Sequence, residues 1–169
     1  MLLVGFAGAF RRSELVAINC NDISRVEEGL IITLRRSKTD QDGKGRQVGI
    51  PNGTGPLCPV QALEEWLRAS GISEGAIFRP VNRYGRLGEN ALSGEAVALI
   101  VKDRARKAGL NPVYYAGHSL RAGLVTSAAA AGAASWKIRE QTGHASDAML
   151  QRYIRDTGLF IDNVAGTVL

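Results

Sequence analysis

The pattern of apolar and polar positions divides the chain into a small number of predicted elements. Apolar residues dominate positions 1–17 and are interrupted only by the polar group at 11–14, which predicts one apolar helix ending near Ala17. No capping residue or lead-in precedes this helix, so we expect that the chain is truncated at its N-terminus. Residues 30–34 and 47–50 are rich in residues that favour β-strands, and the polar stretch 37–45 between them predicts a strand–loop–strand hairpin.

Helical signals fill most of the remaining sequence. Pro59 stands in the first turn of a helix that Gly71 ends, and Ser93 caps a second helix that Gly109 closes. The last third predicts three further helices, over residues 122–131, 135–142 and 146–155, which are followed by Gly132, Gly143 and Gly158. No repeat or Pro-rich linker divides the chain. The sequence therefore predicts one domain of the α+β class, mainly helical with a small antiparallel β-sheet.

Composition agrees with a globular protein and mainly affects the choice of partner. Apolar residues make up 45% of the chain and charged residues 22%, which are close to globular averages. The net charge of +5 favours an anionic partner, either nucleic acid or a membrane surface. The apolar opening is too short to span a bilayer and lacks a basic leader, so we expect a cytoplasmic protein. Cys20 and Cys58 form no CxxC pair, which argues against a disulfide framework or a structural zinc site.

Polar residues that could do chemistry gather in the last third of the chain. The only two histidines stand in the segments HSLR (118–121) and GH (143–144), and Tyr153 follows nine residues after the second. Taken singly, each has a simpler explanation: His118 as a helix cap, His144 in a surface turn, and Tyr153 as a core aromatic residue. Their order along the chain is more informative than any one of them.

Together with the segments GAFRRSEL (8–15) and SKT (37–39), these motifs resemble the tyrosine recombinase, or phage integrase, family. The resemblance runs from about Gly5 to Tyr153 and depends on six positions in the family's order. It implies a catalytic domain over residues 1–169 that lacks the family's N-terminal core-binding domain. It also implies a catalytic set, supported by Glu14, that consists of Arg11, Lys38, His118, Arg121, His144 and Tyr153.

The same residue types suit the cleavage of a phosphodiester. Its pentavalent transition state gains negative charge, and the guanidiniums of Arg11 and Arg121 can clamp the non-bridging oxygens. Tyrosine has a reference pKa of about 10 and must lose its proton as it attacks. We therefore expect Tyr153 to be the nucleophile and His118 to be its base.

The remaining roles concern the leaving group and the phosphate. The leaving 5′ oxygen needs a proton, which Lys38 on the hairpin would supply as a general acid. We expect His144 to donate a hydrogen bond to the phosphate, and Glu14, three residues beyond Arg11 on the same helical face, to hold that arginine. The bond energy stays in the protein–DNA linkage, so the sequence predicts no cofactor, no metal ion and no ATP.

Double-stranded DNA is the expected partner, and no membrane partner is expected. Arg36, Lys44 and Arg46, in and beside the hairpin loop, are the first candidates for contacts to DNA phosphates. The resemblance implies a homo-oligomer on DNA, a tetramer in the synaptic complex, and a C-terminal segment 156–169 that docks on a neighbouring subunit. The alternative is that this segment folds back on its own domain.

Two other functions stay open at this point. A type IB topoisomerase uses similar residues to relax supercoils, although the short chain and the spacing of His144 and Tyr153 look more like an integrase. A non-enzymatic protein, such as a regulatory fragment, could occupy DNA sites without cutting them. Trapping a covalent DNA adduct would separate an enzyme from such a binding protein.

Overall fold

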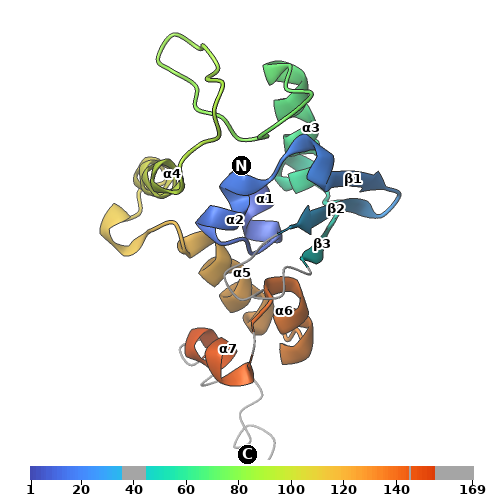
Figure 1. The fold of residues 1–169 in the computed structure, drawn as a ribbon. Coiled ribbons are helices and arrows are strands. Elements are labelled where there is room, and N and C mark those ends of the chain that lie inside the picture. The colour runs from blue at the N-terminus through green and yellow to red at the C-terminus, as the bar shows by residue number, and fades with distance from the viewer. Residues whose placement is uncertain (36–44, 145, 155–169) are drawn as a thin grey trace, which may run out of the picture.

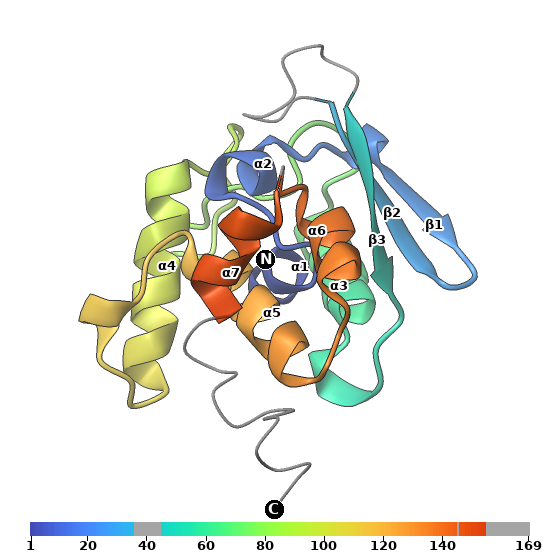
Figure 2. The same ribbon diagram turned by 90° about the horizontal axis from the view of Figure 1, so that it is seen from below.

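The computed structural model describes residues 1–35, 45–144 and 146–154, and of residues 151–154 it gives the backbone only. Within these ranges, α-helices surround one three-stranded antiparallel sheet (Figure 1). Helix α1 (Leu2–Ala7) lies centrally, with α4 (Gly94–Lys107) on one side and the sheet and α3 (Pro59–Ser70) on the other (Figure 2). The predicted α+β class, mainly helical with a small antiparallel sheet, is confirmed.

The apolar N-terminal stretch forms two helices, so the prediction of a single helix is wrong. α1 ends at Ala7, and α2 (Arg12–Ala17) begins after a sharp turn. The Phe10 ring packs so closely against Gly8 that a Cβ atom at position 8 would overlap the ring. A glycine at this position therefore allows Phe10 to be buried in the core. Ala9 takes a φ of 49°, the only positive φ of a non-glycine residue in the described ranges, and this conformation ends the helical path.

The hairpin is confirmed, and the sheet has a further strand that the sequence pattern did not predict. β2 (Gly29–Leu34) pairs antiparallel with β3 (Arg46–Pro51), with Leu30 opposite Ile50. β1 (Ile23–Val26) pairs antiparallel with the other side of β2. This strand has only 4 residues, with two polar ones in the middle, which is too short for a clear alternation. In the order β1-β2-β3, β3 is an edge strand.

The later helices follow the predicted punctuation closely. α3 begins at Pro59 and is closed by Gly71 in the left-handed conformation, and Ser93 Oγ accepts a hydrogen bond from Ala96 N at the start of α4. α5 begins three residues earlier than predicted, and the predicted end of the last helix at 155 lies outside the described residues. The C-terminal helices are α5 (Ser119–Ala130), α6 (Ser135–Thr142) and α7 (Asp147–Ile154), and the short 3-10 helices are η1 (Cys20–Asp22), η2 (Gly55–Leu57) and η3 (Pro112–Tyr114).

Two apolar clusters stabilise this arrangement. The main core joins α1, α2, the sheet, α3 and α4 through buried residues such as Val4, Ile32 and Val97. A smaller cluster joins α5, α6 and α7, which lie together at one end of the molecule (Figure 1). α5 also packs against α1, which connects the two parts. Every helix in the described ranges is too short or too polar to span a bilayer.

Candidate active site

Arg11 and Glu14 form an ion pair at the start of α2. Arg11 immediately precedes the helix in an extended conformation, with a ψ of 150°, so the prediction that it lies on the helical face with Glu14 is wrong. Its backbone N donates to Glu14 Oε2 at 2.9 Å, and its Nη1 donates to Glu14 Oε1 at 2.5 Å. The Glu14 side chain is 2% exposed and that of Arg11 is 19% exposed. A buried carboxylate thus holds a guanidinium that solvent still reaches.

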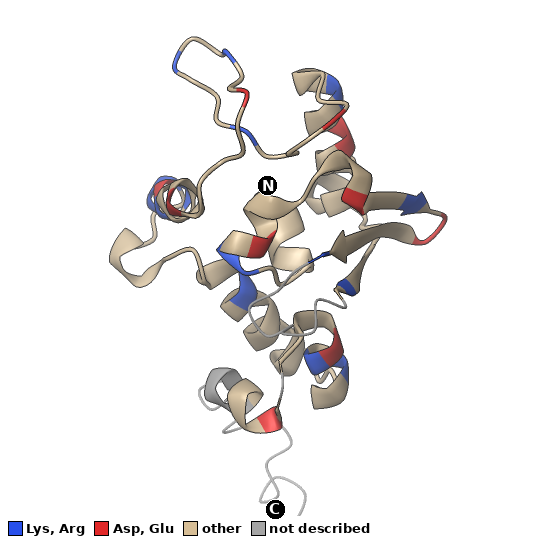
Figure 3. Ribbon diagram, viewed as in Figure 1, with Lys and Arg blue, Asp and Glu red and all other residues tan. Residues whose placement is uncertain are grey.

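Arg121, on α5, is the second arginine of the predicted set and is almost completely buried. Its Nη1 donates to Ala9 O at 2.9 Å and to Thr142 O at 2.6 Å. These carbonyls belong to the turn between α1 and α2 and to the end of α6, so one guanidinium joins segments from both ends of the described chain. Figure 3 shows the basic residues at the start of α2 and on α5 near one another. A charge at this depth needs such polar partners to offset its lost hydration.

His144 follows α6, which is closed by Gly143 with a φ of 67°. The residue is 7% exposed, so the alternative of a surface turn does not describe it. His144 Nδ1 lies 2.8 Å from Thr142 Oγ1, which in turn lies 2.7 Å from Ile138 O. Thr142 therefore contacts His144 through its hydroxyl and Arg121 through its carbonyl.

Positive charges gather around His144. Its burial, followed by the charges of Arg121, Arg11, His118 and Arg46, lowers the pKa of His144 from 6.5 to about 4. The His144 ring is therefore neutral near pH 7. The four neighbours come from three segments that are far apart in the sequence, and the fold brings them around one buried imidazole.

His118 stands before the first residue of α5, and its side chain makes no cap hydrogen bond, so the structure does not support the helix-cap explanation. This residue is exposed, whereas His144 is largely buried. Partial loss of hydration and the charges of Arg121 and Arg11 lower the pKa of His118. A neutral, accessible imidazole beside two arginines can accept a proton.

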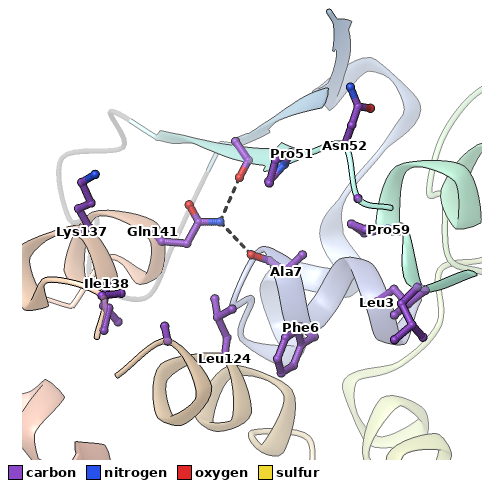
Figure 4. Close-up of a pocket in the computed structure, with 15 residues that line it drawn as sticks. Leu3, Phe6, Ala7, Pro51, Asn52, Pro59, Leu124, Lys137, Ile138 and Gln141 are labelled. Carbon is purple, nitrogen blue, oxygen red and sulfur yellow. Dashed lines mark hydrogen bonds between the residues drawn. The ribbon is translucent and has the colours of Figure 1, made fainter. Parts of the chain in front are cut away.

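Arg46 and Gln141 tie the sheet to the end of α6. Arg46 Nη1 donates to Gln141 O at 2.9 Å, and Arg46 Nη2 lies 3.9 Å from Glu14 Oε2. The Gln141 side chain donates from Nε2 to Ala7 O at 2.8 Å and to Gly49 O at 3.0 Å (Figure 4). The Arg46 side chain is 20% exposed and already has these partners. Its contact with DNA stays a prediction.

Gln141 also borders a pocket of about 500 Å³ between α1, β3, α5 and α6 (Figure 4). Most of its lining is apolar, including Leu3, Phe6 and Leu124, and Lys137 is the only charged residue among the described residues that line it. Such a lining does not suit an anionic phosphodiester. The candidate site therefore lies at the arginines and histidines and not in this pocket.

Four residues of the predicted site cannot be placed by their side chains. Lys38, Arg36 and Lys44 lie outside the described residues. Tyr153 belongs to α7, but its side chain also lies outside the described part. α7 packs against α5 and α6, which carry Arg121 and Thr142. The roles of these four residues stay predictions.

Three contacts of the site were missed by the sequence reasoning. Gln141 and Thr142 are the last residues of α6, just before His144. A threonine in a helix often bonds to the carbonyl four residues earlier, so the bond from Thr142 to Ile138 O could have been predicted from the sequence. Gln141 reaches two distant carbonyls, which no local pattern indicates. Ala9 takes part only through its backbone oxygen, so its side chain carries no signal at all.

Nearly the whole chain is similar to proteins of one known family. Residues 1–158 match the model of the phage integrase family. An integrase/recombinase xerD homolog from Selenomonas ruminantium is 45% identical over 164 residues, which cover 96% of this chain and 48% of that protein. The chain thus spans about half the length of this curated relative.

Solved structures of recombinases share the fold at low identity. The XerA recombinase has a TM-score of 0.67 at 24% identity, with 98% of this chain and 53% of that chain covered. The XerH recombinase bound to a palindromic difH substrate has a TM-score of 0.72 at 20% identity, with 93% and 41% covered. A lambda integrase dimer bound to a core site has a TM-score of 0.63 at 21% identity, with 96% and 53% covered.

Proposed function

Because this chain belongs to the phage integrase family of tyrosine recombinases, we propose that it cleaves and rejoins DNA strands. One arrangement carries this proposal: the buried His144 lies among Arg11, Arg121, Arg46 and His118 from three distant segments, where two backbone carbonyls fix the guanidinium of Arg121. Such a group of donors and cations suits the non-bridging oxygens of a phosphodiester.

The proposed reaction is a transesterification. The Tyr153 hydroxyl attacks phosphorus, forms a 3′-phosphotyrosine bond and displaces the 5′ oxygen, while its proton passes to His118. Arg11 and Arg121 neutralise the charge that develops on the non-bridging oxygens, and Lys38 gives a proton to the leaving oxygen. Attack by a 5′ hydroxyl on the phosphotyrosine reverses each step and rejoins the strand. Bond order and charge balance without ATP, a metal ion or a cofactor.

The described contacts support two of these roles. Arg121 is held by two backbone carbonyls, so its guanidinium is fixed before any substrate binds. The pKa of His118 lies below its ordinary value of 6.5, so this accessible ring is neutral near pH 7 and can take the tyrosine proton. Both properties are what the proposed chemistry requires.

The proposed partner is double-stranded DNA, with Arg36, Lys44 and Arg46 as phosphate contacts. On DNA we expect a homo-oligomer, a tetramer in the synaptic complex. The solved XerH and lambda integrase structures contain their own DNA sites, and the lambda integrase is a dimer there, which supports a proposal of this kind.

Trapping a covalent adduct on a nicked suicide duplex tests the function. The wild-type chain should accumulate an adduct that survives denaturation, whereas Tyr153→Phe should form none, because only the attacking hydroxyl is lost. Tyr84→Phe is the matched control, since Tyr84 is 71% exposed and removal of its hydroxyl should not change adduct formation. An adduct with Tyr153→Phe would contradict the assignment of the nucleophile. DNA binding by the wild type without an adduct would indicate a non-enzymatic binding protein.

A further inference from the structure

The last turn of α6 places the Thr142 hydroxyl 2.8 Å from Nδ1 of His144. We propose that Thr142 is a positioning residue whose hydroxyl keeps the proton of the neutral His144 ring on Nδ1, so that Nε2 can donate to a phosphate only after it takes up a second proton. The assignment of the tautomer depends on the described contacts alone. The identity of the anion as a DNA phosphate rests on the proposed function.

The direction of the hydrogen bonds follows from the number of protons available. Thr142 Oγ1 lies 2.7 Å from Ile138 O and 2.8 Å from His144 Nδ1. A carbonyl oxygen only accepts, so two oxygens at this separation need the hydroxyl proton between them. The hydroxyl has one proton, which leaves its oxygen to accept from Nδ1. The neutral ring therefore carries its proton on Nδ1 and a lone pair on Nε2.

The surroundings fix the orientation of this hydroxyl. Thr142 is 0% exposed, so water does not compete for its oxygen. Its carbonyl accepts from Arg121 Nη1 at 2.6 Å, and the preceding Gln141 side chain is bonded to α1 and β3. Threonine bonding to the carbonyl four residues earlier is a common arrangement in helices. The Thr142 hydroxyl, which accepts from Nδ1, is thus fixed by the contacts of Thr142 and Gln141 with α1, β3 and α5.

Three arginines and one titratable histidine face His144 from three segments of the described structure. Arg121 and His118 belong to α5 and its start, Arg11 precedes α2, and Arg46 begins β3. Burial and these charges keep the DNA-free ring neutral near pH 7.

A bound phosphate would place negative charge among these groups and would raise the pKa of His144. Binding would then draw a proton from solvent onto Nε2. On the neighbouring helices, Arg139 Nη1 and Asp147 Oδ1 pair with each other at 3.2 Å, and neither is among the groups that shift the His144 pKa. From the sequence, His144 was predicted to donate to the phosphate. The geometry adds that it must be doubly protonated to do so.

NMR of the ring nitrogens tests the tautomer in the DNA-free chain near pH 7. Only two histidines contribute, and His118→Gln identifies the signals of His144. We expect the proton on Nδ1 in the wild type and in Thr142→Ser, which keeps the hydroxyl. Thr142→Val has nearly the same shape without the hydroxyl and should lose this tautomer, while its backbone carbonyl still binds Arg121. A wild-type proton on Nε2, or an unchanged tautomer in Thr142→Val, would overturn the inference. The wild-type spectrum decides even where the valine variant does not fold.

A pH titration of the same signals with sodium sulfate tests the coupled proton. Sulfate stands in for the phosphate and does not titrate in this range, and sodium chloride at equal ionic strength is the control for screening. Sulfate should raise the His144 midpoint by about one pH unit or more, a roughly tenfold gain in proton affinity, in the wild type and Thr142→Ser. The shift should be smaller in Thr142→Val, whose neutral ring can donate from Nε2. A wild-type midpoint that sulfate does not move would refute the coupling.

The two proposals fail separately. A covalent DNA adduct from a chain whose His144 proton is on Nε2 would leave the proposed function standing and reject the role of Thr142. A chain that has the Nδ1 tautomer but forms no adduct would support the role of Thr142 and contradict the proposed function.

Discussion

The main core and the C-terminal helices are stabilised by different interactions. Around α1, the sheet, α3 and α4, a large set of apolar side chains is buried, whereas α5, α6 and α7 share the buried residues Val125, Ile138 and Leu150. The smaller region compensates with polar contacts from Arg121, Gln141 and Arg46 to backbone carbonyls. The side chains of Arg121 and Arg46 also face the proposed phosphate site around His144.

This difference means that placement of the helix with Tyr153 depends on residues that would also bind the substrate. Removing apolar side chains from the main core should affect the whole molecule. Removing polar contacts at α6 should loosen α5–α7 first, because regions with few buried apolar contacts open at lower free energy. Each of the following substitutions changes one side of this comparison.

The largest effect is expected for Arg121→Met, which keeps the apolar stem of the side chain and removes its charge and donors. Cleavage should fall by about 100- to 1,000-fold, because a fixed donor to the transition-state charge is lost. The carbonyls of Ala9 and Thr142 also lose a partner, which should destabilise the fold by about 1–3 kcal/mol for each that stays unsatisfied. Single-turnover cleavage and denaturant unfolding measure the two effects.

Arg121→Lys is the control for that substitution. It keeps the charge but replaces the planar guanidinium by one ammonium, so cleavage should be intermediate. Cleavage by Arg121→Met at nearly the wild-type rate would show that the buried arginine is purely structural.

A matched pair of isoleucines compares the two apolar clusters directly. Ile32 is 0% exposed in the main core and Ile138 is 4% exposed in the smaller cluster. Ile32→Ala should lower the free energy of global unfolding by about 2–5 kcal/mol. Ile138→Ala should lower it less and should instead speed amide hydrogen exchange in α5–α7, with the strands unchanged. Equal acceleration over the whole chain by Ile138→Ala would show that the two regions unfold as one unit.

The smallest effect is expected for Gln141→Met, which keeps the length of the side chain but removes its donors to Ala7 O and Gly49 O. Because this side chain is only partly buried, we expect about 1 kcal/mol less protection of the α6 amides in hydrogen exchange, and a modest loss of cleavage. Glu140→Met at the exposed neighbouring position is the control and should change protection by less than about 0.5 kcal/mol. Identical exchange in both variants would show that the hydrogen bonds of Gln141 to α1 and β3 do not stabilise α6.

The sequence predicted what depends on local pattern and on motif order. Ser93, Gly71 and Gly143 gave helix ends because caps and left-handed glycines act over a few residues. The turn at Ala9 was missed, since it depends on how the Phe10 ring packs against Gly8. The contact from Arg121 to Ala9 O crosses 112 residues and ends on a backbone atom, so no side-chain pattern could indicate it. For Thr142, the local signal concerned only its bond to Ile138 O, and its contact with His144 depends on how the chain folds after α6.

The bond from Gln141 to Gly49 O also bears on solubility. Gly49 lies on β3, and the outer edge of an edge strand is a template on which another chain can add a strand. The Gln141 side chain of α6 occupies one carbonyl of this edge, so the helix that carries Thr142 hinders the addition of a strand at that point. Opening of α6 would thus leave the edge of β3 unpaired and would also disassemble the site. Variants that loosen α6 should therefore aggregate more readily than their loss of stability alone would suggest.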